Sequence, residues 1–325
     1  MAGRQAGSKS LNRGKFVAGI GRSIIIAVSV TVIFSAAGCG DGAETAAPPP
    51  LMEMVWIRPG TFTMGSPVTE KGRNNGEGPQ RQVTLSGFYM GSRQVTQEQY
   101  RAVTGTNPSF FSSGPEPGEI QARRPVEQVS WYDAIVFANM LSIKEGLSPA
   151  YSIGGSANPA DWGAAPESSD PGWDAVEIIP DSSGYRLPTE AQWEYACRAG
   201  AEEAFSNRTN DWTDRAAVDP LGWFTFNSGC VTHEAGRKAA NAWGLYDMHG
   251  NVWEWCWDWY GIYPDEAQTD PAGASSGFSR VLRGGCASYS AQSARSAFRN
   301  YAYPSKRLSL GFRLVRPGLT AMSAF

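Results

Sequence analysis

The C-terminal half of the chain carries the clearest strand signals. From Trp253 to Trp259 every second residue is a tryptophan, so the tryptophans fall on one face of a strand and the intervening residues on the other. Segments 281–283 and 312–316 alternate apolar with basic residues, which is typical of half-buried strands. Glycines at 284, 285 and 311 supply turns beside these segments.

Strands are also predicted closer to the N-terminus. Apolar residues at 55–57 and 62–64 flank Arg58-Pro59-Gly60-Thr61, a turn sequence that favours pairing of the two strands as a hairpin. Residues 83–90 are predicted to form one further strand.

Three segments predict helix starts. Residues 96–99, 130–133 and 189–192 each place a Ser or Thr three residues before a side chain that can complete a capping box, and apolar residues follow. Residues 151–183 form a long insertion rich in Gly, Pro and Ser, but no repeat or linker interrupts the chain between 51 and 317. We therefore expect one α+β domain over 51–317 and a short tail, 318–325.

Composition limits the classes of function. The chain has 325 residues, of which 42% are hydrophobic and 18% charged, so it can bury a large core. Its net charge of -3 argues against binding to nucleic acid. The 37 glycines, 21 prolines and 12 tryptophans indicate a fold rich in loops and aromatic side chains.

The N-terminus has the pattern of a targeting segment. Basic residues precede an apolar run over 24–37, as in a secretory signal peptide. The small residues before Cys39 resemble a bacterial lipobox, in which Cys39 would become the lipidated first residue; Ala36 stands where Leu is usual. We expect a lipoprotein signal peptide over 1–39 and a proline-stiffened tether over 40–50. An ordinary signal peptide and an uncleaved anchor are the alternatives.

Four of the five cysteines follow Cys39. An even count in an exported protein permits disulfides, but no CxxC or metal-binding spacing occurs, so pairing cannot be deduced. Buried free thiols are the expectation, above all for Cys197, which lies in an apolar helical pattern.

The segment from 286 to 310 has the composition of a recognition loop. Its residues are largely small or aromatic and uncharged, separated by Arg295, Arg299 and the stretch 304–307. Tyrosine gives a large contact area at low entropic cost, and serine adapts its hydrogen bonding to a ligand. The alternative is an irregular, aromatic-rich surface loop beside a sheet.

Seven motifs carry a resemblance over nearly the whole exported chain. They are MVWIRPGTFTMGS (54–66), QVTQEQY (94–100), RPVEQVSWYDAIVFANML (124–141), YRLPTEAQWEYACRAG (185–200), NAWGLYDMHGNVWEW (241–255), RVLRGG (280–285) and GFRLVR (311–316). In this order they resemble the sulfatase-modifying-factor, or formylglycine-generating-enzyme, family. The resemblance implies the formylglycine-generating-enzyme subtype of the C-type lectin fold, with short antiparallel sheets, few helices and long loops.

The enzymatic chemistry of that family does not carry over. Its oxidases use two copper-binding cysteines after the Gly-Gly turn, and the matching positions here are Tyr289 and Ala294. A lone Cys286 cannot replace a thiolate pair, so we expect no redox cofactor. Related iron enzymes take most of their metal ligands from a separate helical domain, and no such domain is recognised in this sequence. His233 and His249 could form a facial triad with a carboxylate, although His249 is better explained as a loop residue.

One metal site of the family does carry over. The resemblance implies a structural calcium held by side-chain and carbonyl oxygens at Asp247, Gly250, Val252 and Glu254. Such hard oxygen ligands suit Ca²⁺. The alternative is that Asp247 and Glu254 only cap the turn.

Part of the family consists of variable proteins that retroelements diversify by mutating adenines in asparagine codons, which yields residues such as Ser, Tyr, Phe, Ala and Leu. Residues of these types occur here in clusters and predict a variable, ligand-binding face. They are Ala287, Ser288, Tyr289, Ser290, Ser293, Phe298, Tyr301, Ala302, Tyr303, Leu308, Ser309 and Leu310. We expect Arg295, Arg299 and Arg313 to hold this loop through bidentate hydrogen bonds.

The sequence therefore predicts a non-catalytic lipoprotein of the bacterial cell envelope, lipid-anchored in the outer membrane and exposed at the surface. Its variable face would bind a protein or peptide, with a glycan as the lesser option. The membrane partner would be reached through the lipid on Cys39, and no nucleic acid is expected. A formylglycine-type oxidase or related iron enzyme, and a structural envelope lipoprotein, are the alternatives.

Overall fold

A computed structural model describes residues 51–318, which belong to one compact unit. The predicted signal peptide, Cys39 and the tether lie outside the described residues, and so does the predicted tail beyond residue 318. None of the described helices is long and apolar enough to cross a membrane.

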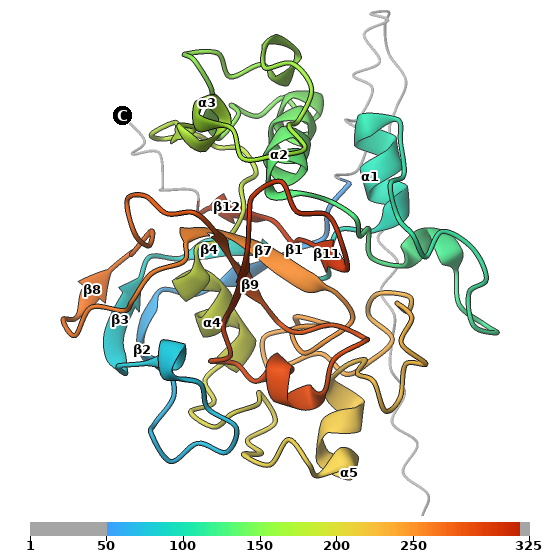
Figure 1. Ribbon diagram of the computed structural model, residues 1–325, viewed down its shortest axis with the longest axis vertical. Helices are drawn as coiled ribbons and strands as arrows, with labels where there is room; N and C mark the ends of the chain where they lie inside the picture. The colour runs from blue at the N-terminus through green and yellow to red at the C-terminus, as the bar shows by residue number, and fades with distance from the viewer. Residues whose placement is uncertain (1–50, 319–325) are drawn as a thin grey trace, which may run out of the picture. The chain divides into compact units, whose positions relative to one another are not determined.

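The fold is α+β, with short sheets and few helices, as predicted (Figure 1). Its central sheet has the order β10-β9-β7-β11, from β7 (Trp253–Trp259), β9 (Arg280–Arg283), β10 (Asn300–Ala302) and β11 (Leu310–Gly311). A second sheet joins β1 (Met54–Ile57), β4 (Phe88–Gly91) and β12 (Val315–Pro317), and a third joins β2 (Gly60–Met64), β3 (Arg81–Leu85) and β8 (Gln268–Thr269). Strands β5 (Tyr151–Ser152) and β6 (Glu177–Ile178) form a pair. Most strand pairings are antiparallel, as predicted, and two, β7 with β11 and β3 with β8, are parallel.

The three predicted helices are present. They are α1 (Gln97–Thr104), α2 (Trp131–Lys144) and α4 (Glu190–Arg198), and each begins with the predicted capping box. Single turns of α-helix form α3 (Pro171–Asp174) and α5 (Arg215–Val218). Short 3₁₀ turns form η1 (Asn75–Glu77), η2 (Gln121–Arg123), η3 (Pro159–Asp161), η4 (Asp219–Leu221) and η5 (Ala291–Ala294). In Figure 1, α2 and α3 lie above the central strands and α5 lies below them.

Strand β7 lies between the two main hydrophobic cores. Trp253 and Trp255 belong to the core that includes α2, whereas Cys256 belongs to the core under α4 and β1–β4. The predicted alternation of β7 is therefore confirmed, but both of its faces are buried. The indole N–H of Trp255 donates to the Val129 carbonyl at 2.8 Å, so this fully buried ring leaves no donor unpaired.

The predicted pairing of the first two strands is wrong. Strand β1 pairs with β4, and β2 pairs with β3, so the two strands belong to different sheets, although Ile57 and Met64 pack in the same core. The predicted strand over 83–90 is likewise divided, because the chain passes from β3 to β4 at Ser86 and Gly87. A Cβ on Gly87 would lie 2.4 Å from the Trp56 ring, so a larger residue at this crossing requires that half-exposed ring to move.

Buried ion pairs join the C-terminal strands to the rest of the fold. Arg313 donates to both oxygens of Glu254, at 2.6 and 2.8 Å, and both side chains are fully buried. Arg307 makes a similar two-pronged contact with Asp133 at the start of α2, at 2.9 and 3.1 Å, but these side chains are 30% and 19% exposed. The two pairs share their chemistry and differ in their contact with water.

We expect Arg313→Met to lower the free energy of unfolding by about 3–5 kcal/mol, because it leaves the buried Glu254 carboxylate without its cation. Arg307→Met is the matched control and should cost less than about 1 kcal/mol, since water can solvate Asp133. Urea unfolding at one pH measures both. Equal losses would contradict the distinction.

Candidate ligand-binding site

Backbone carbonyls hold the beginning of segment 286–310 in place. The amide of Thr225 donates to the Tyr289 carbonyl at 3.0 Å, and the Ser228 hydroxyl donates to the Ala287 carbonyl at 2.7 Å. The Ala287 amide donates to the Asn251 carbonyl at 2.9 Å. None of these bonds uses a side chain of segment 286–310.

Two arginines hold the middle of the segment. Arg295 is fully buried and bridges the carboxylates of Glu70 and Glu77, while Arg299 donates to both oxygens of Glu190 at 2.6 and 2.8 Å. Burial alone would lower the pKa of Arg295, and the neighbouring Glu77 and Glu70 outweigh it, so its guanidinium stays charged. The predicted role of Arg295, Arg299 and Arg313 in holding the loop by charged hydrogen bonds is confirmed.

The end of the segment lies against the start of α2 and β7. The amides of Gln128 and Trp131 donate to the carbonyls of Leu308 and Pro304, at 2.8 and 2.9 Å. The Trp253 amide donates to the Ser309 carbonyl at 3.1 Å. From end to end, the backbone of the segment is attached to neighbours outside it.

Most of the predicted contact residues are accessible. Tyr289, Tyr301, Tyr303 and Leu308 are 51–60% exposed. Ser288 and Ser290 are also exposed, and Phe298, Ala302 and Ser309 are half-buried. These nine residues are called the exposed set below.

Three predicted contact residues are buried, so the expectation that they face a ligand is wrong. Ala287, Ser293 and Leu310 are 4%, 5% and 4% exposed. Leu310 forms β11 beside Trp253 and belongs to the core that includes α2. Ser293 lies in η5, where its hydroxyl donates to the Ser290 carbonyl at 2.8 Å. Leu310 lies in β11 and is held against β7, whereas Leu308 precedes the strand and stays outside, a difference that residue type alone does not reveal.

Two residues of the exposed set, Tyr301 and Ala302, lie on opposite faces of the edge strand β10. Tyr301 pairs with Val281 and contacts Tyr260, with ring centroids 4.5 Å apart. Ala302 pairs with Arg280 and packs on the other core. On that side, buried Trp253 supports Tyr289 and Phe298, with ring centroids 5.7 and 6.0 Å from its own. Aromatic residues outside the segment, Trp253 and Tyr260, thus lie against Tyr289 and Tyr301.

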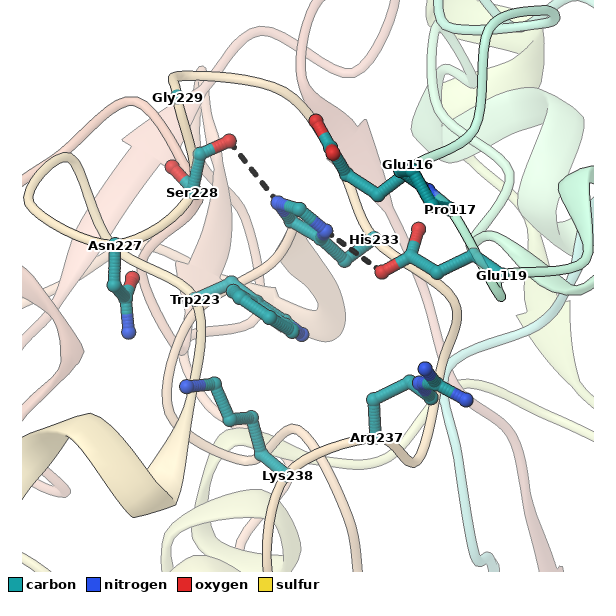
Figure 2. Close-up of a pocket in the computed structure, with 10 residues that line it drawn as sticks. All are labelled: Glu116, Pro117, Glu119, Trp223, Asn227, Ser228, Gly229, His233, Arg237 and Lys238. Carbon is teal, nitrogen blue, oxygen red and sulfur yellow. Dashed lines mark hydrogen bonds and ion pairs between the residues drawn. The ribbon is translucent and has the colours of Figure 1, made fainter.

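A cavity of about 610 Å³ lies beside the start of the segment (Figure 2). His233 stacks on Trp223, with ring centroids 3.8 Å apart, and its two ring nitrogens face Glu119 Oε1 at 2.8 Å and the Ser228 carbonyl at 3.0 Å. Figure 2 shows Lys238 below the same indole and Arg237 nearby. Sequence reasoning did not find this cavity, because its residues come from three separate segments with no shared motif.

The two histidines have structural contacts. His249 is buried; its Nδ1 donates to the Ala294 carbonyl at 2.7 Å and its Nε2 accepts from the Ser206 hydroxyl at 3.0 Å. Burial lowers the pKa of His249 to about 4, so the ring is neutral at physiological pH. Within 51–318, no group of three or more His, Cys, Asp or Glu side chains is placed to bind a metal. The facial triad considered from the sequence, with His233 and His249 as ligands, therefore does not form among the described residues.

The buried thiols of Cys197 and Cys286 are not activated. Burial raises the pKa of Cys197 to about 12 and that of Cys286 above its usual value, so both remain protonated at neutral pH. All four described cysteines are free, and Cys230 alone among them is exposed. The expectation of buried free thiols is thus confirmed for Cys197, Cys256 and Cys286.

The structure does bring together the four residues predicted to hold calcium. Three of them contribute backbone carbonyls, at Asp247, Gly250 and Val252, and Glu254 contributes Oε1. The point toward which these oxygens converge is taken by the amide nitrogen of Gln94, at 2.9–3.3 Å from each. Calcium itself stays a prediction, and Gln94 is a competitor for its place that the sequence did not reveal.

Comparison with known proteins agrees with this architecture. Residues 41–317 match the family described as the sulfatase-modifying factor enzyme 1-like domain. The structure is similar to that of Treponema denticola variable protein 1, with 40% identity and a TM-score of 0.74 over 82% of this chain and 95% of that one.

Two curated relatives are also similar in sequence. The formylglycine-generating enzyme of Mus musculus is 30% identical over 83% of this chain and 77% of its own length. The chaperone protein LppX of Paenibacillus barcinonensis is 39% identical over 55% of this chain, and the match spans 65% of that relative, just under two thirds.

Leu308 and Leu310 provide a test of which predicted residues face solvent. We expect Leu310→Ala to lower the free energy of unfolding by about 2–5 kcal/mol, because it opens a cavity in the core. Leu308→Ala should change it by no more than about 0.5 kcal/mol, since its side chain is 52% exposed. Chemical denaturation of the two variants measures the contrast, and similar losses would mean that Leu308 also packs inside.

A pH dependence should arise from Glu127, beside the segment's attachment at Gln128. Glu127 is 1% exposed, and its Oε1 accepts from the Phe111 amide while its Oε2 has no hydrogen-bond partner. Burial raises the pKa of Glu127 to about 7, against 4.5 for the free side chain.

The folded state holds the Glu127 proton more tightly than the unfolded state does. The contribution of Glu127 to the free energy of unfolding should therefore be greatest below pH 4.5 and fall as pH rises to about 7. Glu127→Gln should remove that decline, on the order of 1–3 kcal/mol, when unfolding is measured between pH 5 and 8. An unchanged slope in the variant would assign the decline to another group.

Proposed function

Because this chain belongs to the sulfatase-modifying factor enzyme 1-like domain family, and because its C-terminal segment combines an anchored backbone with exposed aromatic side chains, we propose that it is a variable ligand-binding protein. The observation that carries the proposal is that the groups which hold segment 286–310 in place are not the side chains that it exposes to solvent. The bonds that hold segment 286–310 use backbone carbonyls and buried arginines, and the exposed set makes none of them through side chains.

Such a segment tolerates exchange of its exposed residues. Substitutions at exposed positions away from caps and ion pairs change stability by about 0.5 kcal/mol or less. Trp253 and Tyr260 lie under the exposed tyrosines and offer an aromatic platform that does not depend on which residues are displayed. The likeness to Treponema denticola variable protein 1 supports the same function, and diversification by a retroelement would supply the variation.

The chemistry of the displayed residues favours a protein or peptide ligand. Tyr289, Tyr301, Tyr303 and Leu308 supply large contact areas of the kind that anchor protein interfaces. Stacking of a sugar ring on a tyrosine is the lesser option.

Catalysis of the formylglycine type is the less supported alternative. Tyr289 and Ala294 occupy the positions matched to the paired cysteines, and neither can bind copper as a thiolate. Cys286 is close to Tyr289 in sequence, and Cys197 lies in the core. Burial raises the pKa of both thiols and keeps them protonated. The segment therefore has neither the thiolate pair nor an activated single thiol.

Localisation follows from residues upstream of the described domain. Lipidation of Cys39 would attach the chain to the outer membrane of the bacterial envelope, and the tether over 40–50 would hold the domain at the surface. Display outside the cell is where a variable binding face would meet its ligand.

Deep sequencing of codons 286–310 in a growing culture tests the proposal. We expect substitutions to concentrate at the exposed set, while codons for Arg295 and Arg299 stay unchanged because their ion pairs hold the loop. Buried Ala287, Ser293 and Leu310 should vary less, and only among residues of similar size. Codons 251–259 in the same molecules give the background rate, and a segment as invariant as that control would refute the proposal.

A further inference from the structure

The side chain of Gln94 occupies the centre of the four-oxygen cage formed by residues 247–254. Gln94 is 1% exposed and lies between β4 and α1. Its Nε2 lies 2.9 Å from Glu254 Oε1 and 3.1, 3.2 and 3.3 Å from the carbonyl oxygens of Val252, Gly250 and Asp247. The approach of four acceptors to one point is the arrangement that a cation would ordinarily satisfy.

Hydrogen-bond chemistry determines which end of the amide faces the cage. The NH₂ group has two protons, and turning the amide round would instead place its oxygen among four other oxygens. The observed orientation leaves Gln94 Oε1 buried without a partner, which itself carries a cost. The four acceptors therefore decide the orientation, because the amide nitrogen is the positive end of the group.

The charge of the cage does not fit a divalent cation as well as its geometry does. Glu254 is the single carboxylate among the four ligand groups, and it is already paired with Arg313 at 2.6 and 2.8 Å. Its Oε2 also accepts from the Trp193 indole at 2.7 Å. A doubly charged ion here would lie close to a buried guanidinium, and the one carboxylate oxygen that faces it belongs to a group already paired. The Asp247 side chain is also buried beside the cage; its Oδ2 accepts from the Gly236 amide at 2.7 Å, and its Oδ1 has no hydrogen-bond partner.

We propose that the Gln94 amide takes the place of the structural cation that this cage holds in related proteins, and that it organises the 247–254 loop without metal. The loop in turn supports the variable segment. The Gly250 amide donates to the Gly284 carbonyl at 2.7 Å, and the Asn251 carbonyl accepts from Ala287 at 2.9 Å. The platform for the displayed residues would thus be independent of the calcium concentration outside the cell.

The test compares the wild-type domain with Gln94→Glu, which keeps the side-chain shape and replaces the NH₂ group by an anionic oxygen. Wild-type protein should have the same Tm in millimolar calcium and in EDTA, and calorimetric titration should detect no calcium binding. Gln94→Glu should lose roughly 4–12 °C in EDTA, because five oxygens then face one another, and calcium should restore most of that loss.

Gln121→Glu is the matched control. The Gln121 amide nitrogen also donates to two acceptors, Gln97 Oε1 and the Phe111 carbonyl, but it lies outside the cage. This variant should show no response to calcium. Calcium binding by the wild-type protein would overturn the proposal by itself, even if no variant folds, and so would a folded Gln94→Glu protein that ignores calcium.

Discussion

Buried arginine–carboxylate pairs are the interaction on which the C-terminal half of this fold depends. Arg283, Arg295, Arg299 and Arg313 are 0–6% exposed, and each pairs with a carboxylate far away in the sequence. Removing such charges from water costs several kcal/mol per ion, so each pair is favourable only with its full set of hydrogen bonds. That requirement makes the geometry specific, because a shifted loop would leave charges buried and unpaired.

The pairs explain how one segment can be both well anchored and exchangeable. Arg295 and Arg299 alternate along the chain with exposed residues, so the anchor points and the display points are interleaved. On either side of the two arginines, neighbouring groups donate to backbone carbonyls such as those of Tyr289 and Leu308, and every amino acid has such a carbonyl. Replacing an exposed side chain therefore leaves the bonds that position it intact.

The same scaffold is similar to that of formylglycine-generating enzymes, and the difference in proposed function arises at few positions. Where those enzymes carry paired cysteines, this chain has Tyr289 and Ala294. At the centre of the cage, where the resemblance implies a cation, the structure places the Gln94 amide. Fold and function are separable here because the residues of the core and of the ion pairs are not the residues exposed at the site.

The sequence alone determined the parts that local rules govern. Capping residues Thr96, Ser130 and Thr189 located three helices, because a cap acts over three residues. The alternation of β7 and the exposed tyrosines were also predicted from local pattern.

Tertiary structure alone decided that β1 and β2 enter different sheets and that Leu310 is buried while Leu308 is not. It also brought Gln94 to a cage more than 150 residues away in the chain. Such outcomes depend on which distant partner a residue meets, and periodicity along the chain contains no information about that partner.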